Sequence, residues 1–312
     1  MNKNGLLLLI SITVIIFAVL GIAFYRDRAD GLFHIVFCDV GQGDGIYMRF
    51  PGGEDVIVDG GPNARILTCV SEHMAFWDRT IEIVLLTHPQ YDHFKGLTDI
   101  ISRYEVELLL APPVDNKAES YHEFMNIVRE KGIPVRNPYE GDQITIPGES
   151  PSDESKMSIL WPPDDWVADR MTTGDDTREL LSKKVLGVAT HHKDLNDFSI
   201  VTSISYGLFD VLLTGDAESQ LLEEIVNSGD IVSNDIEVLK TPHHGANAGI
   251  NQSIIEYIRP DIAVISVGKN NQYGHPSPEV LELLEKFDIP VKRTDQDGEI
   301  EIVSDGKSWQ IH

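Results

Sequence analysis

Four side chains that are suited to metal binding or proton transfer follow one apolar segment of the chain. Residues 81–86 are predicted to form a buried strand. Within the six residues that begin at position 88, the sequence then places His88, Gln90, Asp92 and His93. Two imidazoles and a carboxylate directly after a strand are typical of one half of a metal site. Gln90 is the exception, because a neutral amide is a poor ligand for zinc.

Similar polar clusters follow other predicted strands. They are DVGQGD at 39–44, VDGG at 58–61, LLTGD at 212–216, TPHHG at 241–245 and GHP at 274–276. Taken singly, a Gly-Asp pair is a common turn and a lone histidine usually caps or fills a core. Taken together, the clusters bring five of the eleven histidines to strand ends beside Asp92 and Asp216. Strand ends are where sheet proteins usually place their sites.

The elements that must position these residues are short strands followed by strands that alternate with helices, in both halves of the chain. Strands are expected near 33–38, 46–50, 56–58, 81–86, 106–110, 157–161, 198–206, 209–213, 236–239 and 262–267. Helices are expected near 64–76, 94–103, 120–131, 218–227, 252–258 and 278–287. A sandwich of two sheets with helices outside fits this order.

One segment interrupts the pattern. Residues 162–196 carry many charges and no clear strand, and this length is too great for a passive connection. We expect a lid or a mobile insertion there, with a short helix near 178–185.

The amino-acid composition narrows the classes of partner and of metal site that this chain can have. The chain has 25 Lys and Arg against 50 Asp and Glu, a formal net charge of −25. This balance gives no general attraction to nucleic acid and repels phosphate at low salt. The two cysteines, Cys38 and Cys69, exclude a disulfide framework and a cysteine-based zinc site. They do not reveal the redox compartment.

The N-terminal residues differ in kind from the rest. A short tail at 1–4 precedes the uncharged segment GLLLLISITVIIFAVLGIAFY at 5–25, which is long enough to cross a bilayer. We expect a single-pass anchor, and a cleaved signal peptide with secretion is the alternative. Basic residues on both flanks leave the orientation open, and we place the remaining chain outside the cytoplasm.

In this order, the clusters resemble the metallo-β-lactamase superfamily, whose signature is H-x-H-x-D-H after a strand and a later Gly-Asp. They resemble more closely the soluble hydrolase domain of ComEC-type competence DNA-uptake proteins. The residues that carry this resemblance are DVGQGD at 39–44, VDGG at 58–61, THPQYDHFKG at 87–96, NDFS at 196–199, LLTGDAE at 212–218, LKTPHHG at 239–245 and VISVGKNNQYGHP at 264–276. The resemblance covers nearly all of residues 32–312 and implies an α/β fold, the αββα sandwich, as one hydrolase domain. The multi-span channel part of those proteins has no counterpart in this sequence.

The resemblance also implies two divalent metal ions, zinc or manganese. The ligands of these ions would be His88, Gln90, Asp92, His93, Asp216 and His243, with Asp216 bridging the ions. Between adjacent histidines, His243 is preferred to His244 because it lies nearer the strand end. Side chains that support the ligands would be Asp39, Asp44, Asp59, His244, Asn196 and Ser199.

The sequence departs from the superfamily pattern at one of the two metal positions. Gln90 stands where the superfamily has histidine, and the segment 196–199 lacks a further histidine. The second position, made by Asp92, His93, Asp216 and His243, is complete. Oxygen ligands at the first position would shift its preference from zinc toward manganese or magnesium. His191 and His192 are expected to be a solvated loop pair, with substitute ligands as the alternative.

The function implied by the resemblance is hydrolysis of a phosphodiester in single-stranded DNA, in company with DNA-uptake channel components. The metal ions would make a bound water more acidic and polarise the ester. Asp92 would accept a proton, and His275 would contact substrate or protonate the leaving oxygen. One alternative is a metallo-hydrolase for another envelope-associated ester or phosphorylated polymer, which the charge of −25 favours. The other is a membrane-anchored binding module without catalysis, which Gln90 favours.

Overall fold

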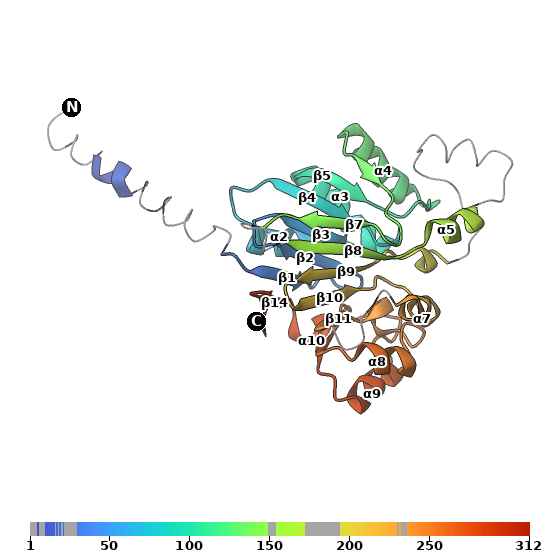
Figure 1. The fold of residues 1–312 in the computed structure, drawn as a ribbon. Helices are drawn as coiled ribbons and strands as arrows, with labels where there is room; N and C mark the ends of the chain where they lie inside the picture. The colour runs from blue at the N-terminus through green and yellow to red at the C-terminus, as the bar shows by residue number, and fades with distance from the viewer. Residues whose placement is uncertain are drawn as a thin grey trace.

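Two β-sheets stacked face to face form the centre of the computed structural model (Figure 1). The structure describes residues 30–148, 154–171, 194–229, 231 and 236–312, together with isolated positions between 5 and 21. The first sheet has the order β15-β14-β1-β2-β3-β4-β5-β6, and the second has the order β13-β12-β11-β10-β9-β8-β7. Helices cover the outer face of each sheet. The expected αββα sandwich is therefore confirmed.

The strands of the first sheet are β1 (Phe33–Phe37), β2 (Gly45–Arg49), β3 (Asp55–Gly60), β4 (Thr80–Leu85), β5 (Glu105–Leu110), β6 (Val135–Arg136), β14 (Ile300–Ser304) and β15 (Trp309–Ile311). Those of the second are β7 (Gln143–Ile146), β8 (Ser155–Trp161), β9 (Val201–Tyr206), β10 (Phe209–Leu213), β11 (Val238–Lys240), β12 (Ile262–Ile265) and β13 (Val291–Arg293). The helices are α2 (Arg65–His73), α3 (Tyr91–Arg103), α4 (Glu119–Glu130), α5 (Asp164–Met171), α7 (Ser219–Ser228), α8 (Gln252–Ile258), α9 (Pro278–Lys286) and α10 (Thr294–Asp297). Two short 3-10 turns, η2 (Asn196–Phe198) and η3 (Pro242–Gly245), follow the same numbering.

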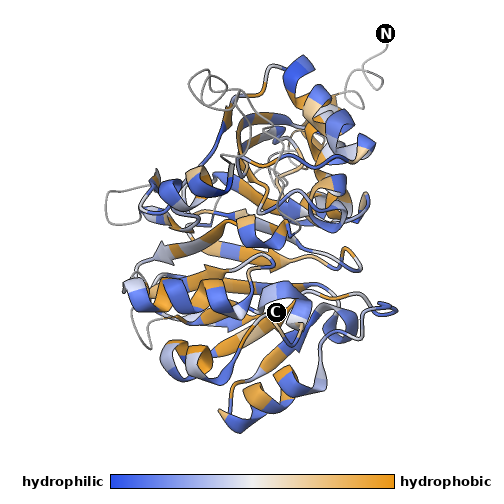
Figure 2. Ribbon diagram, turned by 90° about the vertical axis from the view of Figure 1, so that its right-hand side faces the viewer, coloured by the Kyte–Doolittle hydropathy of each residue, from blue (hydrophilic) through white to orange (hydrophobic). Residues whose placement is uncertain are grey.

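Strand β1 shows how the sequence produces the layers. Side chains alternate between the two faces of a strand. Phe33, Ile35 and Phe37 accordingly join the core between the sheets, whereas Val36 packs in the core beneath α2, α3 and α4. A third core lies between the second sheet and α7, α8 and α9. Figure 2 shows the apolar residues concentrated on the strands and the polar residues on the outer helical faces.

The topology brings the polar clusters together at one edge. Strands β3, β4 and β5 are parallel, as are β10, β11 and β12. The carboxyl ends of parallel neighbours lie at the same edge of a sheet. The segments that follow β3, β4, β10, β11 and β12 therefore meet, and these segments carry the motifs.

Two boundaries differ from the sequence expectation. Helix α3 begins at Tyr91 and not near 94, so Asp92 and His93 occupy its first turn. Phe94, Leu97, Ile100 and Ile101 form its buried face, and this spacing is helical. Within 162–196, helix α5 forms where no element was expected, while the short helix expected near 178–185 lies outside the described residues.

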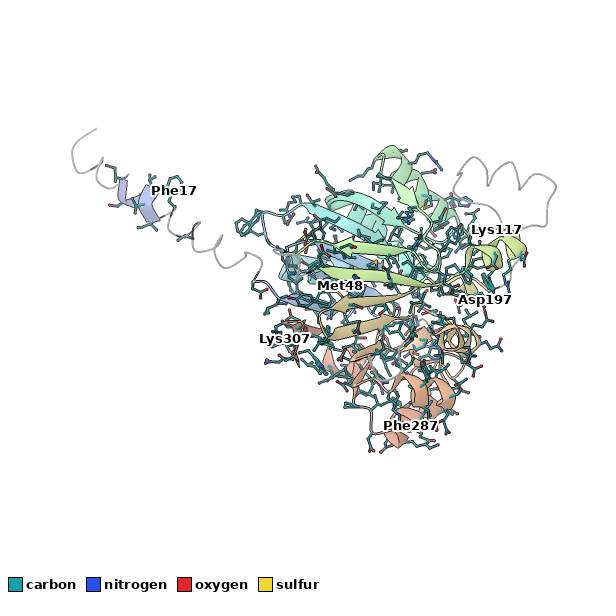
Figure 3. All side chains as sticks on the ribbon, in the orientation of Figure 1. Phe17, Met48, Lys117, Asp197, Phe287 and Lys307 are labelled. Atoms are coloured by element: carbon teal, nitrogen blue, oxygen red, sulfur yellow. A yellow bond between two sulfur atoms is a disulfide. The ribbon has the colours of Figure 1, made fainter. Side chains whose placement is uncertain are left out.

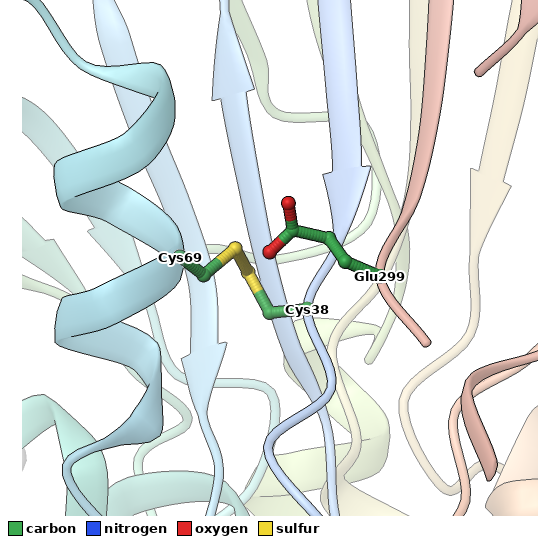
Figure 4. A group of neighbouring side chains, drawn as sticks. All are labelled: Cys38, Cys69 and Glu299. Atoms are coloured by element: carbon green, nitrogen blue, oxygen red, sulfur yellow. A yellow bond between two sulfur atoms is a disulfide. The ribbon is translucent and has the colours of Figure 1, made fainter. Parts of the chain in front are cut away.

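The two cysteines are joined. Cys38, which follows β1, forms a disulfide with Cys69 on α2, with their Cα atoms 5.9 Å apart (Figure 4). The carboxylate of Glu299 faces this bond. Two cysteines cannot build a framework, but they can make one bridge, which the sequence did not predict. Their separation of 31 residues contains no pairing signal, since the contact depends on how α2 packs on the sheet.

The N-terminal anchor remains a prediction. In the part of the chain that the structure describes, no helix is long and apolar enough to cross a membrane. Most of 5–25 lies outside the described residues. The positions that are described are helical, and their large apolar side chains are exposed, with Phe17 at 69% (Figure 3).

Candidate metal centre

Asp216 lies at the centre of the polar cluster. It follows β10 in the turn Thr214-Gly215-Asp216, and its backbone N–H donates to Ser199 Oγ at 3.2 Å. Gly215 has φ +52°, and a Cβ there would lie 3.0 Å from the Thr87 side chain. Glycine is therefore needed for the turn to approach the segment after β4. The turn directs a fully buried carboxylate toward the opposite half of the sandwich.

Four imidazoles surround one oxygen of this carboxylate. The distances from Asp216 Oδ2 are 3.4 Å to His93 Nε2, 3.5 Å to His244 Nε2, and 3.9 Å to both His88 Nε2 and His243 Nε2. Burial alone would raise the pKa of Asp216, but His244 and His93 hold that pKa well below its ordinary range. Asp216 is therefore an anion, and it attracts cations to this point.

Hydrogen bonds to the far nitrogens orient two of these imidazoles. His93 Nδ1 donates to Asp59 Oδ2 at 2.7 Å, and His244 Nδ1 donates to the Ser266 carbonyl at 3.0 Å. Asp59 also accepts the backbone N–H and the hydroxyl of Thr87, at 2.8 and 2.7 Å. Metal-binding histidines are held in this way, because the bond at one nitrogen leaves the other free to bind the ion. Asp59 thus lies behind His93 and orients its imidazole.

Asp92 completes one ligand set. It lies on the first turn of α3, and its Oδ2 is 3.5 Å from His244 Nε2. Asp92, His93 and His244 offer three ligand atoms within 4.8 Å of one another. Asp216 lies beside them, 3.4 Å from His93 Nε2 and 3.5 Å from His244 Nε2, so these four residues are candidate ligands for one metal position.

The geometry reverses the choice between the adjacent histidines. The side chain of His244 is 2% exposed, and its Nε2 faces both Asp92 and Asp216. His243 is 25% exposed, with Nδ1 3.9 Å from Glu218 and its ring 5.8 Å from that of His275. Both histidines have positive φ, at 48° and 54°. This tight left-handed turn buries the second side chain between Asp92 and Asp216, and it leaves the first at the rim with its Nε2 3.9 Å from Asp216 Oδ2. The geometry therefore favours His244 over His243 as the candidate ligand.

The other metal position is partly closed by the two residues at which the sequence departs from the pattern. The Gln90 side-chain amide donates to Asn196 Oδ1, so these two side chains contact each other. His88 remains beside Asp216. Burial and the neighbouring His93 lower the pKa of His88 to about 3, so its imidazole is neutral and able to bind a cation. His191 and His192, the alternative donors, lie outside the described residues.

The residues present fit a divalent cation. Among the described residues, His88 Nε2, His93 Nε2, His244 Nε2 and Asp216 Oδ1 are buried polar atoms that make no hydrogen bond. Leaving a buried polar atom without a partner costs about 1–3 kcal/mol. A cation between Asp92, His93 and His244 would satisfy the nitrogens of these two histidines, and His88 Nε2 faces the other position beside Asp216. In the absence of a cation, Asp216 and Asp44 raise the pKa of His244 to about 9 against the effect of burial, so a cation must displace a proton there.

Lys240 is a functional residue that the sequence analysis missed. It ends β11, is fully buried, and its ammonium forms an ion pair with Asp44. Its Nζ also donates to the Gly215 carbonyl at 3.0 Å and lies 3.9 Å from Asp216 Oδ1. The other oxygen of Asp44 is 3.3 Å from His244 Nδ1. The available signal was a lysine at the end of an apolar strand, where a charge is tolerated only when it is paired.

Three other expected residues are placed as follows. Asp39 does not reach the site: its side chain is 44% exposed, and it lies 3.5 Å from Arg65 Nη1. DVGQGD therefore contributes through Asp44, because the loop turns at Gly41 and Gly43 and sends only its last carboxylate inward. Ser199 supports the Asp216 turn, and His275 lies at the mouth of the site beside His243.

Comparison with known proteins defines the class. Residues 38–269 match the model of the metallo-beta-lactamase superfamily. The chain belongs to this superfamily of metal-dependent hydrolases, as its motifs predict.

Two relatives show which members of this superfamily the chain resembles in sequence. It is 27% identical to ComE operon protein 3 of Bacillus subtilis (strain 168) over 223 residues. These aligned residues cover 72% of this chain and 24% of that protein. It is 23% identical to Recombination protein 2 of Haemophilus influenzae over 288 residues. These aligned residues cover 90% of this chain and 30% of that protein. The similarity to ComEC-type competence proteins is confirmed by these relatives. The chain spans about a quarter to a third of their length.

Two solved structures share the fold. The metallo-beta-lactamase fold protein YhfI from Bacillus subtilis has a TM-score of 0.52 and 12% identity, covering 86% of this chain and 99% of that one. Igni18 from Ignicoccus hospitalis has a TM-score of 0.51 and 13% identity, covering 86% and 98%. At this identity the likeness concerns the fold alone.

Removing His244 should abolish tight metal binding, whereas removing His243 should not. His244→Ala deletes an imidazole at the complete position, and we expect its affinity for Mn²⁺ or Zn²⁺ to fall by more than about 100-fold. His243→Ala should stay within about threefold of wild type. Calorimetric titration of the metal-stripped proteins, with elemental analysis of bound metal, measures both. Equal losses in the two variants would contradict the assignment.

The same titration tests the partly closed position. We expect wild type to bind one equivalent tightly and Gln90→His/Asn196→His to bind a second, with preference for zinc, since imidazole is the better zinc ligand. An unchanged stoichiometry would mean that these two side chains do not face the metal.

Breaking the buried ion pair should destabilise the fold. Lys240→Met leaves Asp44 buried without its cation, and we expect a loss of about 3–5 kcal/mol in the free energy of unfolding. Lys292→Met is the matched control, because the Lys292–Asp297 pair is partly exposed and should contribute less than about 1 kcal/mol. Urea unfolding measures both variants. The double variant Lys240→Met/Asp44→Asn should recover part of the lost free energy of unfolding. Such a recovery would show that the loss comes from the unpaired Asp44 carboxylate.

Proposed function

We propose that this chain is a metal-dependent phosphodiesterase that acts on single-stranded DNA. The observation that carries the proposal is the convergence of Asp92, His93, Asp216 and His244 on one buried point. Family membership supports hydrolysis, and the competence-related names of the relatives support DNA as the substrate. DNA-uptake channel components are the proposed partners.

The chain's own residues would bind and orient the reactants. A divalent ion supplies Lewis-acid polarisation of a phosphoryl oxygen and makes water more acidic. Burial raises the pKa of Asp92, but His244 and His93 bring it down to about 2. Such an acidic carboxylate is a weak general base, so we assign Asp92 mainly to metal binding and to orienting the attacking water through a hydrogen bond.

His275 has a different place in the mechanism. Burial and His243 lower the pKa of His275, so its imidazole is neutral at neutral pH. A neutral imidazole donates a hydrogen bond but is a poor source of a full proton. We therefore propose that His275 contacts the leaving side of the phosphodiester as a hydrogen-bond donor.

We further propose that the two metal positions are unequal. The position made by Asp92, His93, Asp216 and His244 would hold one ion firmly. The other has His88 and the shared Asp216, while Gln90 and Asn196 are engaged with each other. It would bind weakly, and manganese or magnesium would suit its oxygen ligands better than zinc.

A second candidate is hydrolysis of another envelope-associated ester or phosphorylated polymer. The net charge of −25 favours it, because such a protein has no general affinity for DNA phosphates. A membrane-anchored binding module is the non-catalytic alternative, and its support is the Gln90–Asn196 pair. The intact metal position argues against it.

We also propose that residues 5–25 anchor the chain in a membrane and that the hydrolase domain lies outside the cytoplasm. The exposed apolar side chains of this segment support the anchor. The Cys38–Cys69 disulfide supports an oxidising compartment.

Phosphodiesterase activity should require Asp216. Metal-loaded protein is expected to hydrolyse single-stranded oligothymidylate, and Asp216→Ala to lose at least about 1000-fold in turnover, because the shared carboxylate and its charge are removed. Asp39→Ala is the control and should retain wild-type turnover. Product analysis by denaturing gel measures the rates. Failure to cleave any phosphodiester, together with hydrolysis of a carboxylic ester, would transfer the assignment to the second candidate.

The proposed membrane anchor and oxidising compartment are tested by a separate experiment. We expect the full chain in the membrane fraction of the producing cells, with both cysteines resistant to a thiol reagent until a reductant is added. Fractionation followed by alkylation and mass spectrometry checks both points. A mature N-terminus near Phe24 in the soluble fraction would establish signal cleavage in place of an anchor, and freely alkylated cysteines would contradict the oxidising compartment.

A further inference from the structure

An exposed tyrosine is held in a fixed position at the mouth of the metal centre. Tyr273 is 71% exposed, and its loop follows β12. Asn271 organises this loop: its Nδ2 donates to the carbonyls of Gly268 at 3.0 Å and His275 at 2.8 Å. Its Oδ1 accepts the backbone N–H of Tyr273 at 3.2 Å and that of His275 at 3.0 Å. Four hydrogen bonds to one side chain preorganise the loop.

The loop is also tied to the ligand-bearing turn. Ser277 N donates to the Gly245 carbonyl at 2.8 Å, next to His244. A Cβ on Gly245 would lie 2.6 Å from Pro276, so the two segments are in direct contact. The position of Tyr273 is therefore set relative to the metal centre.

Three rings extend from solvent to the metal ligands. The Tyr273 ring is stacked on that of His275, with centroids 5.9 Å apart and planes 13° apart. The His275 ring is 5.8 Å from that of His243, and His243 Nε2 is 3.9 Å from Asp216 Oδ2. The outer end of this series is the Tyr273 ring, which is exposed to solvent.

Polar groups lie between this ring and the metal centre. His275 Nδ1 and His243 Nδ1 are buried nitrogens that make no hydrogen bond among the described residues. Lys269 lies on the same loop and is exposed, so this loop carries a cation in a strongly acidic protein. Imidazole N–H groups and an ammonium can donate hydrogen bonds to phosphate oxygens. An exposed phenol ring can instead stack on another planar ring.

We propose that Tyr273 is a stacking platform for a nucleobase, and that His275, His243 and Lys269 contact the phosphate attached to that nucleotide. The inference rests on the proposed phosphodiesterase function and adds a specificity-determining subsite to it. Stacking of one base on an aromatic side chain strengthens binding by about tenfold and is tolerant of base identity. It would supply base-dependent affinity in a chain whose net charge opposes binding to DNA. The ligand class is a nucleotide with an unpaired base, as in single-stranded DNA.

The test compares two substrates that differ only in their bases. They are the dinucleotide d(TpT) and its abasic analogue, in which hydrogen replaces both thymines. For the metal-loaded full chain we expect d(TpT) to have the lower KM, by about tenfold. Tyr273→Ala should raise the KM for d(TpT) to that of the analogue while kcat stays within twofold. Tyr273→Phe and Tyr273→Trp should restore the low KM.

Phe76→Ala is the matched control, because Phe76 is 55% exposed but precedes β4, at the end of the sheet opposite the site. It should leave both KM values unchanged. Equal KM values for the two substrates in wild type, or a preference that survives in Tyr273→Ala, would overturn the platform and leave the phosphodiesterase assignment intact.

A binding measurement separates the inference from the activity. Fluorescence anisotropy compares a labelled pentathymidylate with an abasic pentamer, using wild type and Tyr273→Ala. If neither oligothymidylate nor either dinucleotide is hydrolysed, the proposed function fails. A base preference of about tenfold that disappears in Tyr273→Ala would then still support the platform, and equal affinities for the two pentamers would overturn it.

Discussion

The metal centre depends on one buried ion pair that joins the two sheets. Asp44 lies just before β2 in the first sheet, and Lys240 ends β11 in the second. A buried lysine is costly unless a carboxylate and hydrogen bonds compensate for its lost hydration, and here Asp44 and the Gly215 carbonyl do so. The pair links the two halves at the edge where their ligands meet. It also leaves the second oxygen of Asp44 against His244.

Neither half of the sandwich contains a complete ligand set. The first supplies Asp92 and His93, with Asp59 behind them, and the second supplies Asp216 and His244. The ends of parallel strands can provide ligands in this way because each strand ends at the same edge while its loop remains free to vary. Metal affinity and the packing of the two sheets are consequently coupled. A change that shifts one sheet against the other would separate the ligands without altering any of them.

The asymmetry of the centre has a specific physical form. Gln90 and Asn196 do not simply lack imidazoles: the Gln90 amide donates a hydrogen bond to Asn196 Oδ1, so these two side chains contact each other. His88 is retained beside them, buried and neutral, and its Nε2 makes no hydrogen bond among the described residues. The two candidate positions therefore differ in the donors that face an ion: one has two imidazoles and two carboxylates, and the other has His88 and the shared Asp216.

The sequence by itself determined the layered α/β fold and most of the site. The alternation of apolar residues along strands such as β1 and the helical spacing of Phe94, Leu97 and Ile101 are local patterns, and they specify which faces are buried. The order of motifs along the chain identified His88, Asp92, His93 and Asp216. Only the tertiary structure decided between His243 and His244, because the φ values of the η3 turn determine which side chain faces inward. It also decided the Lys240–Asp44 pair, the Cys38–Cys69 bridge, the Gln90–Asn196 contact and the outward position of Asp39. Such pairings join residues far apart in the chain, and local periodicity contains no information about which distant segment packs against them.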